Sequence, residues 1–310
     1  MTREKLGRFW NMYRSVIIMV VFAIVVGFVN NRFLRFSNIM NILNQTSINA
    51  VLAAGLTVVI LTGGIDISVG STLAFSGAIA AYMLERGFSA AIVVVAALLV
   101  GLCVGFANGL FIARWNLQPM IVTLAMMSIF RGATYLLTNG SPISVSDKAF
   151  KLIGGGKIFS VIPVPIVIMI AIFIVMYYVL GSTPFGRHIY AVGGNEEASR
   201  LSGISTTNTK IIAYMISGLM AAIAGIIVTS RLSSAQPLAG QSYEMDAIAA
   251  AVIGGTSLKG GQGRILFTIV GALIIGMLNN ALNLLDVSTY YQTVVKGVVI
   301  LAAVLIDAKS

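Results

Sequence analysis

The chain has 310 residues, of which 58% are hydrophobic and 10% are charged, whereas a soluble domain carries about 25% charged residues. This composition leaves almost no room for a soluble domain and indicates a protein embedded in a membrane. The net charge of +10 does not indicate nucleic-acid binding, because Lys and Arg are spread through short linkers between apolar runs. In membrane proteins such charges set the topology, since loops rich in Lys and Arg stay in the cytoplasm.

The N-terminus combines a basic cluster that ends at Arg14 with an apolar run from Ser15 to Val29. This pattern is similar to a signal peptide, but Asn30-Asn31-Arg32 lacks the small residues of a cleavage site. We therefore predict an uncleaved first span that enters the membrane from the cytoplasm.

Apolar segments continue to the C-terminus, and a helix needs roughly 20 mostly apolar residues to cross a bilayer. The sequence thus predicts an all-α polytopic membrane protein, a single transmembrane domain over residues 1–310 with both termini in the cytoplasm. The ten expected spans cover roughly residues 15–30, 45–62, 69–84, 89–113, 119–138, 161–181, 211–230, 244–258, 265–285 and 292–307. Segments 69–84 and 244–258 are short or broken by glycine, as transporter helices often are.

Two glycine pairs in this series have similar surroundings. Gly63-Gly64 and Gly254-Gly255 each follow an apolar run and precede a polar turn and a helix rich in Gly and Ala. Both turns face the cytoplasm in the expected topology, so a duplication would give a parallel internal repeat. The general similarity of Gly- and Ala-rich membrane helices is the alternative.

Asp66 lies directly after the first of these turns, in LTGGIDISVGS. An acidic residue inside the membrane is costly and usually marks function, so a proton or ion site is one interpretation. The neighbouring glycines and serines favour the other, in which Asp66 caps a helix that begins near Ile67.

The longest polar segment expected on the cytoplasmic side covers residues 182–210. Within it, Asn195 can cap a helix and Gly203 can end it. Glu196 and Glu197 favour the positive N-terminal end of such a helix. The sequence predicts an exposed helix of about two turns, which suits docking into a groove on a soluble partner. A linker lying on the membrane surface is the alternative.

Two further polar groups are candidates for contact with a substrate or partner. The segment 231–246 is expected outside, where it either meets a substrate or partner or forms an ordinary loop; its candidate residues are Gln236, Gln241, Tyr243 and Glu244. Asn279 and Asn283 are four residues apart on one helix face. Together with Gln292 they either line a pore, where amides bind sugar hydroxyls, or join helices to each other.

The sequence contains no phosphate-binding loop, HExxH or GxSxG motif. It has one histidine, His188, and one cysteine, Cys103, so neither a histidine cluster for a metal nor an intrachain disulfide is expected. The chain has no recognisable machinery of its own for nucleotide hydrolysis.

Four blocks carry a family resemblance: LTGGIDISVGS, GRHIYAVGGNEEASRLSGI, RLSSAQPLAGQSYEMDAIAAAVIGGTSLKGGQGR and NNALNLLDVSTYYQTVVKGVVILAAVLID. In this order they resemble the permease subunits of bacterial ABC importers for monosaccharides such as ribose. The resemblance covers nearly the whole chain. It implies an inner-membrane importer that works by ATP-driven alternating access.

The resemblance also implies partners. These are a second permease subunit, expected to be a copy of this chain, a cytoplasmic ATP-binding subunit and a periplasmic sugar-binding protein. ATP would be held by the partner, so this chain would bind no cofactor. The residues that match the family's ATPase-coupling segment are Gly194, Asn195, Glu196, Glu197, Ala198, Gly203 and Ile204. An ion- or proton-coupled secondary transporter is the alternative, with Asp66, Glu244 or Asp246 as its coupling acid.

Overall fold

A computed structural model describes residues 3–309, with side chains described from 14 to 305. The described residues form thirteen helices and four short strands. The helices are α1 (Arg3–Val29), α2 (Phe36–Leu61), α3 (Val69–Glu85), α4 (Ala90–Arg114), α5 (Pro119–Thr138), α6 (Lys148–Gly155), α7 (Val164–Ser182), α8 (Pro184–Gly194), α9 (Glu196–Leu201), α10 (Thr206–Leu232), α11 (Tyr243–Ile253), α12 (Ile265–Leu284) and α13 (Thr289–Lys309). The strands are β1 (Ile143–Ser144), β2 (Lys157–Ile158), β3 (Ile162–Pro163) and β4 (Ser234–Ala235).

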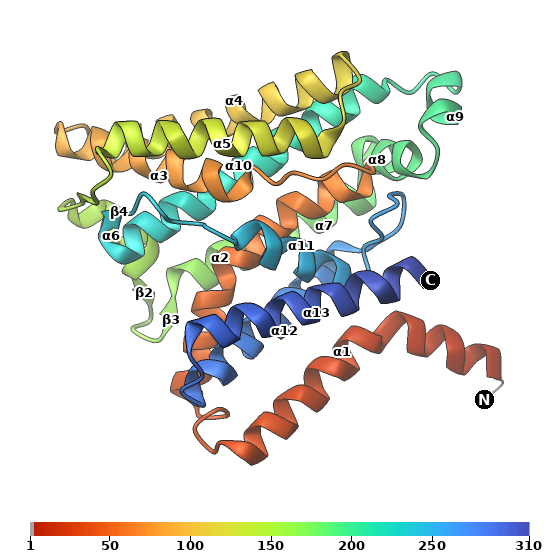
Figure 1. Ribbon diagram of the computed structural model, residues 1–310, viewed down its shortest axis with the longest axis horizontal. Coiled ribbons are helices and arrows are strands. Elements are labelled where there is room, and N and C mark those ends of the chain that lie inside the picture. The colour runs from red at the N-terminus through yellow and green to blue at the C-terminus, as the bar shows by residue number, and fades with distance from the viewer. Residues whose placement is uncertain (1–2, 310) are drawn as a thin grey trace.

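The long helices lie roughly side by side between two ends of the molecule (Figure 1). One end carries α6 and the strands, where β1 pairs with β4 and β2 with β3, both antiparallel. The opposite end carries α8, α9, the start of α1 and the end of α13. We call these the strand end and the α9 end.

Helix α2 lies inside the bundle, because every residue from Ala50 to Leu61 is buried. Helix α10 packs against α2, α3 and α4. Its contact with α4 is close: a Cβ atom on Gly101 would overlap the carbonyl of Gly218. Small residues commonly allow such backbone approach between membrane helices, where no hydrophobic effect draws the helices together.

The prediction of an all-α polytopic membrane protein is confirmed, and each of the ten expected segments is helical over most of its length. Among the described residues, the helices both long and apolar enough to cross a bilayer are α2, α4, α5, α7, α10 and α12. Shorter apolar stretches cover Arg14–Val29 and Thr289–Leu305. The number of ten crossings stays a prediction.

The expected span at 244–258 needs correction. Helix α11 has 11 residues and is therefore about 17 Å long, whereas the hydrocarbon core is roughly 30 Å thick. Residues 236–242, which precede it, are not helical. This part of the chain combines a non-helical segment with a short helix, and the helix falls short of the expected span because it ends just before Gly254 and Gly255, the second of which has a φ of +87°.

The expected parallel repeat stays a prediction. The turns at Gly63 and Gly260 lie together, and the helices before them, α2 and α11, differ greatly in length. The segments that match in shape are 62–85 and 233–253, each a non-helical stretch followed by a short helix. Their helices α3 and α11 begin at one place, where Gly70 contacts Gly240.

These two short helices point in opposite directions. Helix α3 runs parallel to α10, since Gly77 lies against Thr229 while Leu73 lies against Gly225. Helices α2 and α11 both run antiparallel to α12, as the Gly271–Ala250 contact and the other contacts along α12 show. Because α2 is antiparallel to α10, α3 and α11 run in opposite directions, whereas α2 runs parallel to α11 and α3 runs parallel to α12.

Candidate substrate pocket and coupling segment

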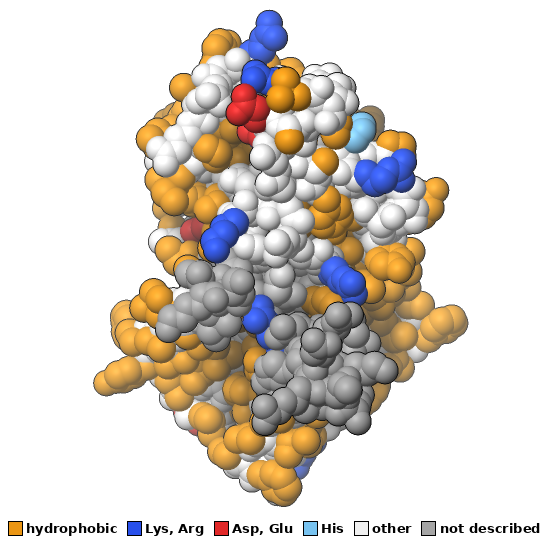
Figure 2. Space-filling view, turned by 90° about the vertical axis from the view of Figure 1, so that its right-hand side faces the viewer, with side chains coloured by type: hydrophobic (Ala, Val, Ile, Leu, Met, Phe, Trp, Pro, Cys, Tyr) orange, Lys and Arg blue, Asp and Glu red, His pale blue; other side chains and the backbone are white. Residues whose placement is uncertain are grey.

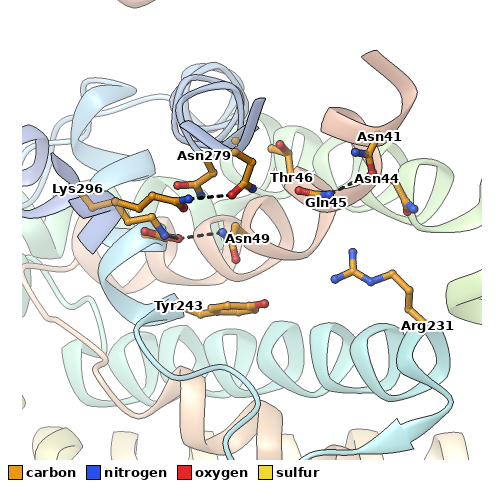
Figure 3. Close-up of a pocket in the computed structure, with 13 residues that line it drawn as sticks. Asn41, Asn44, Gln45, Thr46, Asn49, Arg231, Tyr243, Asn279 and Lys296 are labelled. Carbon is orange, nitrogen blue, oxygen red and sulfur yellow. Dashed lines mark hydrogen bonds and ion pairs between the residues drawn. The ribbon is translucent and has the colours of Figure 1, made fainter. Parts of the chain in front are cut away.

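A polar cavity of about 370 Å³ lies among α2, α10, α11, α12 and α13 (Figure 3). Its walls come from residues that are far apart in the sequence but share helix faces. The lining residues are Asn41, Asn44, Gln45, Thr46, Asn49, Arg231, Tyr243, Asp246, Gly276, Asn279, Asn283, Gln292 and Lys296.

Helical periodicity explains why these amides face one space. On α2, Asn41, Gln45 and Asn49 recur every four residues, and on α12, Asn279 and Asn283 do the same. Residues four apart lie on the same face of a helix. The two faces meet closely because Gly276 has no side chain and a Cβ atom there would overlap the hydroxyl of Thr46.

Several oxygens of the cavity wall have no hydrogen-bond partner. Among the described residues, seven buried side-chain oxygens are unpaired, and four of them belong to cavity residues. These four are the amide oxygens of Asn44, Asn49 and Asn279 and the hydroxyl oxygen of Thr46. Because buried polar atoms are nearly always paired in proteins, this concentration indicates that the wall is built to bind hydrogen-bonding groups of a ligand.

Other side chains of the wall are held in place. Lys296 donates from Nζ to Asp246 Oδ2 at 3.0 Å, and Asn49 donates its amide to the same oxygen at 3.3 Å. Gln292 donates to Asn283 Oδ1 at 2.8 Å. Arg231 and Tyr243 face the α2 amides from the opposite side of the cavity (Figure 3). The result is a wall of amides, a phenol, a guanidinium and a paired charge, which suits a ligand rich in hydroxyl groups.

The structure brings the three predicted path residues, Asn279, Asn283 and Gln292, into this one cavity. It separates the four residues expected on an outer loop. Tyr243 lines the cavity, and the carboxylate of Glu244 lies against Gly70 inside the bundle. The segment around them is drawn inward because Arg131 donates to the carbonyls of Pro237 and Ala239, at 2.9 and 2.8 Å.

The remaining two residues of that group are placed differently. Gln241 is exposed, and Gln236 is half-buried and donates to Ser234 Oγ at 2.9 Å. Only Gln241 therefore remains freely presented among the four residues expected to meet an external protein.

The α2 amides were missed by sequence reasoning. The expected span began at residue 45, so Asn41 and Asn44 were assigned to the preceding loop. Their signal was present in the four-residue spacing of polar residues through Asn49 within an otherwise apolar helix. The acid–base pair of Asp246 and Lys296 had no local signal, because the two residues lie on different helices.

Asp66 does not cap a helix that begins near Ile67, because α3 begins at Val69 with Ser68 as its N-cap; Asp66 lies in the turn before it. Its Oδ1 accepts from the backbone N–H and the hydroxyl of Ser68, at 3.0 and 2.6 Å, and its Oδ2 accepts from Ser217 at 2.7 Å. Asn108 completes the cluster by donating to Ser68 Oγ at 2.8 Å. Through these hydrogen bonds the buried carboxyl group connects α3, α4 and α10.

The three acids considered for ion coupling all have local counterparts. Asp66 lies at the positive N-terminal end of α3, Asp246 pairs with Lys296, and Glu244 lies in the field of Arg131. Each of these acids thus balances the positive charge of a helix end or of a basic side chain.

The predicted coupling helix is present as α9, with Asn195 as its N-cap. Asn195 Oδ1 accepts from the Ala198 N–H at 2.9 Å, and Gly203, with φ of +84°, follows its end. Lys210 binds Glu196 and so joins α9 to α10. The side chain of Glu197 is 78% exposed, and Leu201 is 81% exposed.

The rest of the segment 182–210 is more structured than expected. Residues 184–194 form α8. Its N-cap is Thr183, whose hydroxyl accepts from the Gly186 N–H at 3.2 Å. Ile189 and Val192 of α8 are buried. Helical spacing is present in Phe185, Ile189 and Val192, but the Gly and polar residues between them made this stretch read as part of a polar linker.

Helix α8 ends at a backbone junction that we define as Leu61, Gly193 and Gly261. Gly261 donates its N–H to the Leu61 carbonyl at 2.9 Å. A Cβ atom on Gly193 would overlap that same carbonyl. The junction therefore connects α8 with the end of α2 and with the loop that follows α11, and both of these helices line the cavity.

Comparisons with known proteins agree with this architecture. Residues 38–304 match the family described as branched-chain amino acid transport system / permease component. The chain is 52% identical to the ribose import permease protein RbsC of Haemophilus influenzae, over 98% of this chain and 95% of the relative. It is 49% identical to RbsC of Bacillus subtilis, over 99% and 93%.

A more distant relative is the L-arabinose transport system permease protein AraH of Escherichia coli, 39% identical over 97% of this chain and 92% of the relative. No solved structure matches the chain. The alternative of a secondary transporter is not supported, because the relatives are import permeases matched along almost their whole length. This chain therefore belongs to the family of transport-system permease components that its sequence matches from residue 38 to residue 304.

Proposed function

We propose that this chain is the membrane subunit of an ABC importer that moves a ribose-like monosaccharide into the cytoplasm, and that the amide-lined cavity is its sugar site. The observation that carries the proposal is the set of four unpaired oxygens in the cavity wall. An amide offers both a donor and an acceptor, which matches the dual character of a sugar hydroxyl. The names of the relatives point to the same class of ligand.

In the proposed orientation the chain lies in the inner membrane and its α9 end faces the cytoplasm. The start of α1 and the end of α13 both lie at this end (Figure 1). Figure 2 looks onto the same end and shows Lys, Arg, Asp and Glu side chains on the face, with hydrophobic side chains gathered along its flanks. That distribution fits a polar face in water and flanks in lipid, and loops rich in Lys and Arg stay in the cytoplasm.

The proposed partners follow from this orientation. The exposed residues of α9 would meet an ATP-binding subunit that holds the ATP, and the strand end would meet a periplasmic sugar-binding protein. A second copy of this chain would complete the membrane part. Movement of α9 and α8 would reach the cavity through the junction of Leu61, Gly193 and Gly261. A partner shifts such an equilibrium only through its different affinities for the two states.

The test is sugar uptake into proteoliposomes that contain this chain, with and without the ATP-binding subunit and a loaded sugar-binding protein. We expect uptake of ribose only when both partners and internal ATP are present. Omission of each component in turn provides the controls. Uptake by the chain alone under a proton or sodium gradient would contradict the proposal, and uptake of arabinose but not ribose would correct the substrate.

A further inference from the structure

A second cavity lies at the α9 end, away from the sugar site. It has a volume of about 770 Å³ and lies between the last turns of α7, the helix α8 and the first turns of α12. Its lining combines apolar side chains with two arginines. The residues are Tyr177, Leu180, Gly181, Arg187, Tyr190, Arg264, Ile265, Leu266, Phe267 and Val270.

The position of this groove is at the edge of the membrane. Helices α7 and α12 are both long and apolar enough to cross a bilayer, so their ends at the groove mark the boundary of the hydrocarbon core. Tyr177 and Leu266 are 56% and 48% exposed, which places apolar wall next to lipid. Gly181 has no side chain and nothing packed over its Cβ position, so the groove is open on the α7 side.

The charge of the groove is positive. Arg187 and Arg264 are both exposed, and the lining contains no acidic residue. Tyr190 donates its hydroxyl to the Gly263 carbonyl at 3.0 Å and thereby fixes the start of α12 against α8. Burial raises the pKa of the Tyr190 phenol, so this group stays neutral and adds no negative charge.

We propose that this groove binds one anionic phospholipid, with its phosphate between Arg187 and Arg264 and an acyl chain along Leu266 and Val270. Basic pockets between membrane helices bind anionic lipid head groups in this way, and arginine matches phosphate through paired N–H donors. Charge complementarity and the apolar wall together select a lipid rather than a free phosphate, which would use only the arginines. This proposal does not depend on the identity of the transported sugar.

The experiment measures retained lipid. The purified full-length chain is exchanged into micelles with equal amounts of phosphatidylglycerol and phosphatidylcholine, and bound lipid is counted by native mass spectrometry. We expect wild type to retain phosphatidylglycerol selectively. The double variant Arg187→Gln, Arg264→Gln should retain roughly tenfold less, since each basic side chain contributes noticeably to anionic-lipid affinity.

Two further variants make the result specific. Val270→Trp fills the groove without changing its charge and should also release the lipid. Arg32→Gln, Arg35→Gln removes two exposed arginines between α1 and α2, at the other end of the molecule, and should retain it. Gel filtration of each variant checks that it is folded.

The possible occupants give different outcomes. Equal retention of both lipids by wild type, or unchanged retention in the double arginine variant, would overturn the proposal. If the double arginine variant retained lipid unchanged but no longer bound the ATP-binding subunit, this too would overturn the proposal and would assign the groove to a protein interface. Displacement by millimolar inorganic phosphate, with no effect of Val270→Trp, would reduce the site to a phosphate site and reject the lipid.

Discussion

At the scale of single residues, two neighbouring amides of α12 have different surroundings. Asn279 lines the amide-lined cavity and has an unpaired oxygen. Asn280 exchanges two hydrogen bonds with Asn38 of α2, at 2.9 and 3.0 Å. The sequence NN thus contains one residue available to a ligand and one that joins two helices, which are the two roles that were open from the sequence.

This difference gives a matched pair of variants. Asn279→Ala should lower uptake at low sugar concentration roughly five- to tenfold, the effect of one lost hydrogen bond, and leave thermal stability nearly unchanged. Asn280→Ala should instead lower the free energy of unfolding by about 1–3 kcal/mol, because Asn38 loses both hydrogen bonds to Asn280 and its Oδ1 is left without a donor. Uptake in proteoliposomes and thermal unfolding in detergent measure the two effects. An exchange of the two phenotypes would contradict the assignment.

The pair of Lys296 and Asp246 gives a second prediction. The side chain of Asp246 is 5% exposed, so Lys296→Met leaves a buried carboxylate without its cation. We expect this change to lower the free energy of unfolding by about 3–5 kcal/mol. The double variant Lys296→Met, Asp246→Asn should recover much of the loss, since no charge remains unpaired. Denaturant unfolding of the four proteins gives the coupling energy, and additive losses would contradict a direct interaction.

How far the sequence predicts the site is clearest at this scale. Asn283 and Gln292 were identified because amides are conspicuous in apolar helices. Asn44 was not, because it lies near the start of a helix whose polar first turns are easily mistaken for a loop. The contact between Thr46 and Gly276 joins positions that are distant in the sequence, and local patterns carry no information on such pairs.

At the scale of elements, Arg131 of α5 holds the non-helical segment before α11. We expect Arg131→Met to speed backbone hydrogen exchange in residues 238–242 and to lower stability, because two buried carbonyls lose a charged donor. Arg114→Met removes an exposed arginine at the end of α4 and serves as the control. Unchanged exchange in the Arg131 variant would show that the segment is held by its packing alone.

The two acidic residues of helix α9 have different surroundings. Glu196 is bound to Lys210, whereas Glu197 and Leu201 are presented outward. We expect Glu197→Ala, Leu201→Ser to reduce sugar-stimulated ATP hydrolysis in the reconstituted complex without a change in stability, since the pair makes few contacts within this chain. Glu196→Ala should reduce it by loosening α9 from α10, with a measurable loss of stability. Normal coupling in the first variant would place the docking surface elsewhere.

The elements differ in how far the sequence predicts them. Helix α9 was predicted with its caps, because capping depends on residues within one turn such as Asn195 and Gly203. Helix α8 was not, because it is stabilised by burial of Ile189 against other helices. The length of α11 was overestimated for a related reason: an apolar run indicates burial, but it does not show where the helix ends, which here is at Ile253.

At the scale of the whole molecule, the orientation can be tested directly. In a Cys103→Ser background, Glu197→Cys should react with a membrane-impermeant maleimide only after the inner face of the membrane is opened. Ser160→Cys, in the exposed turn between β2 and β3, should react in intact spheroplasts. The reverse pattern would invert the proposed topology, and labelling of both sites from one side would mean an even number of crossings between them.

The opposite directions of α3 and α11 could not be predicted from the sequence. The expected repeat compares glycine pairs, which recur wherever membrane helices turn. The match between segments 62–85 and 233–253 is one of shape: each is a non-helical stretch followed by a short helix. Different residues satisfy that geometry in the two halves, with Asp66 in one and Arg131 in the other.

The junction of Leu61, Gly193 and Gly261 has one further consequence. It ties the end of α8 to the end of α2 and to the loop after α11 through one hydrogen bond and one close backbone contact. The contact leaves no room for a side chain at Gly193, so we expect Gly193→Ala to force these three segments apart. Two of the helices that line the cavity would then shift at their ends.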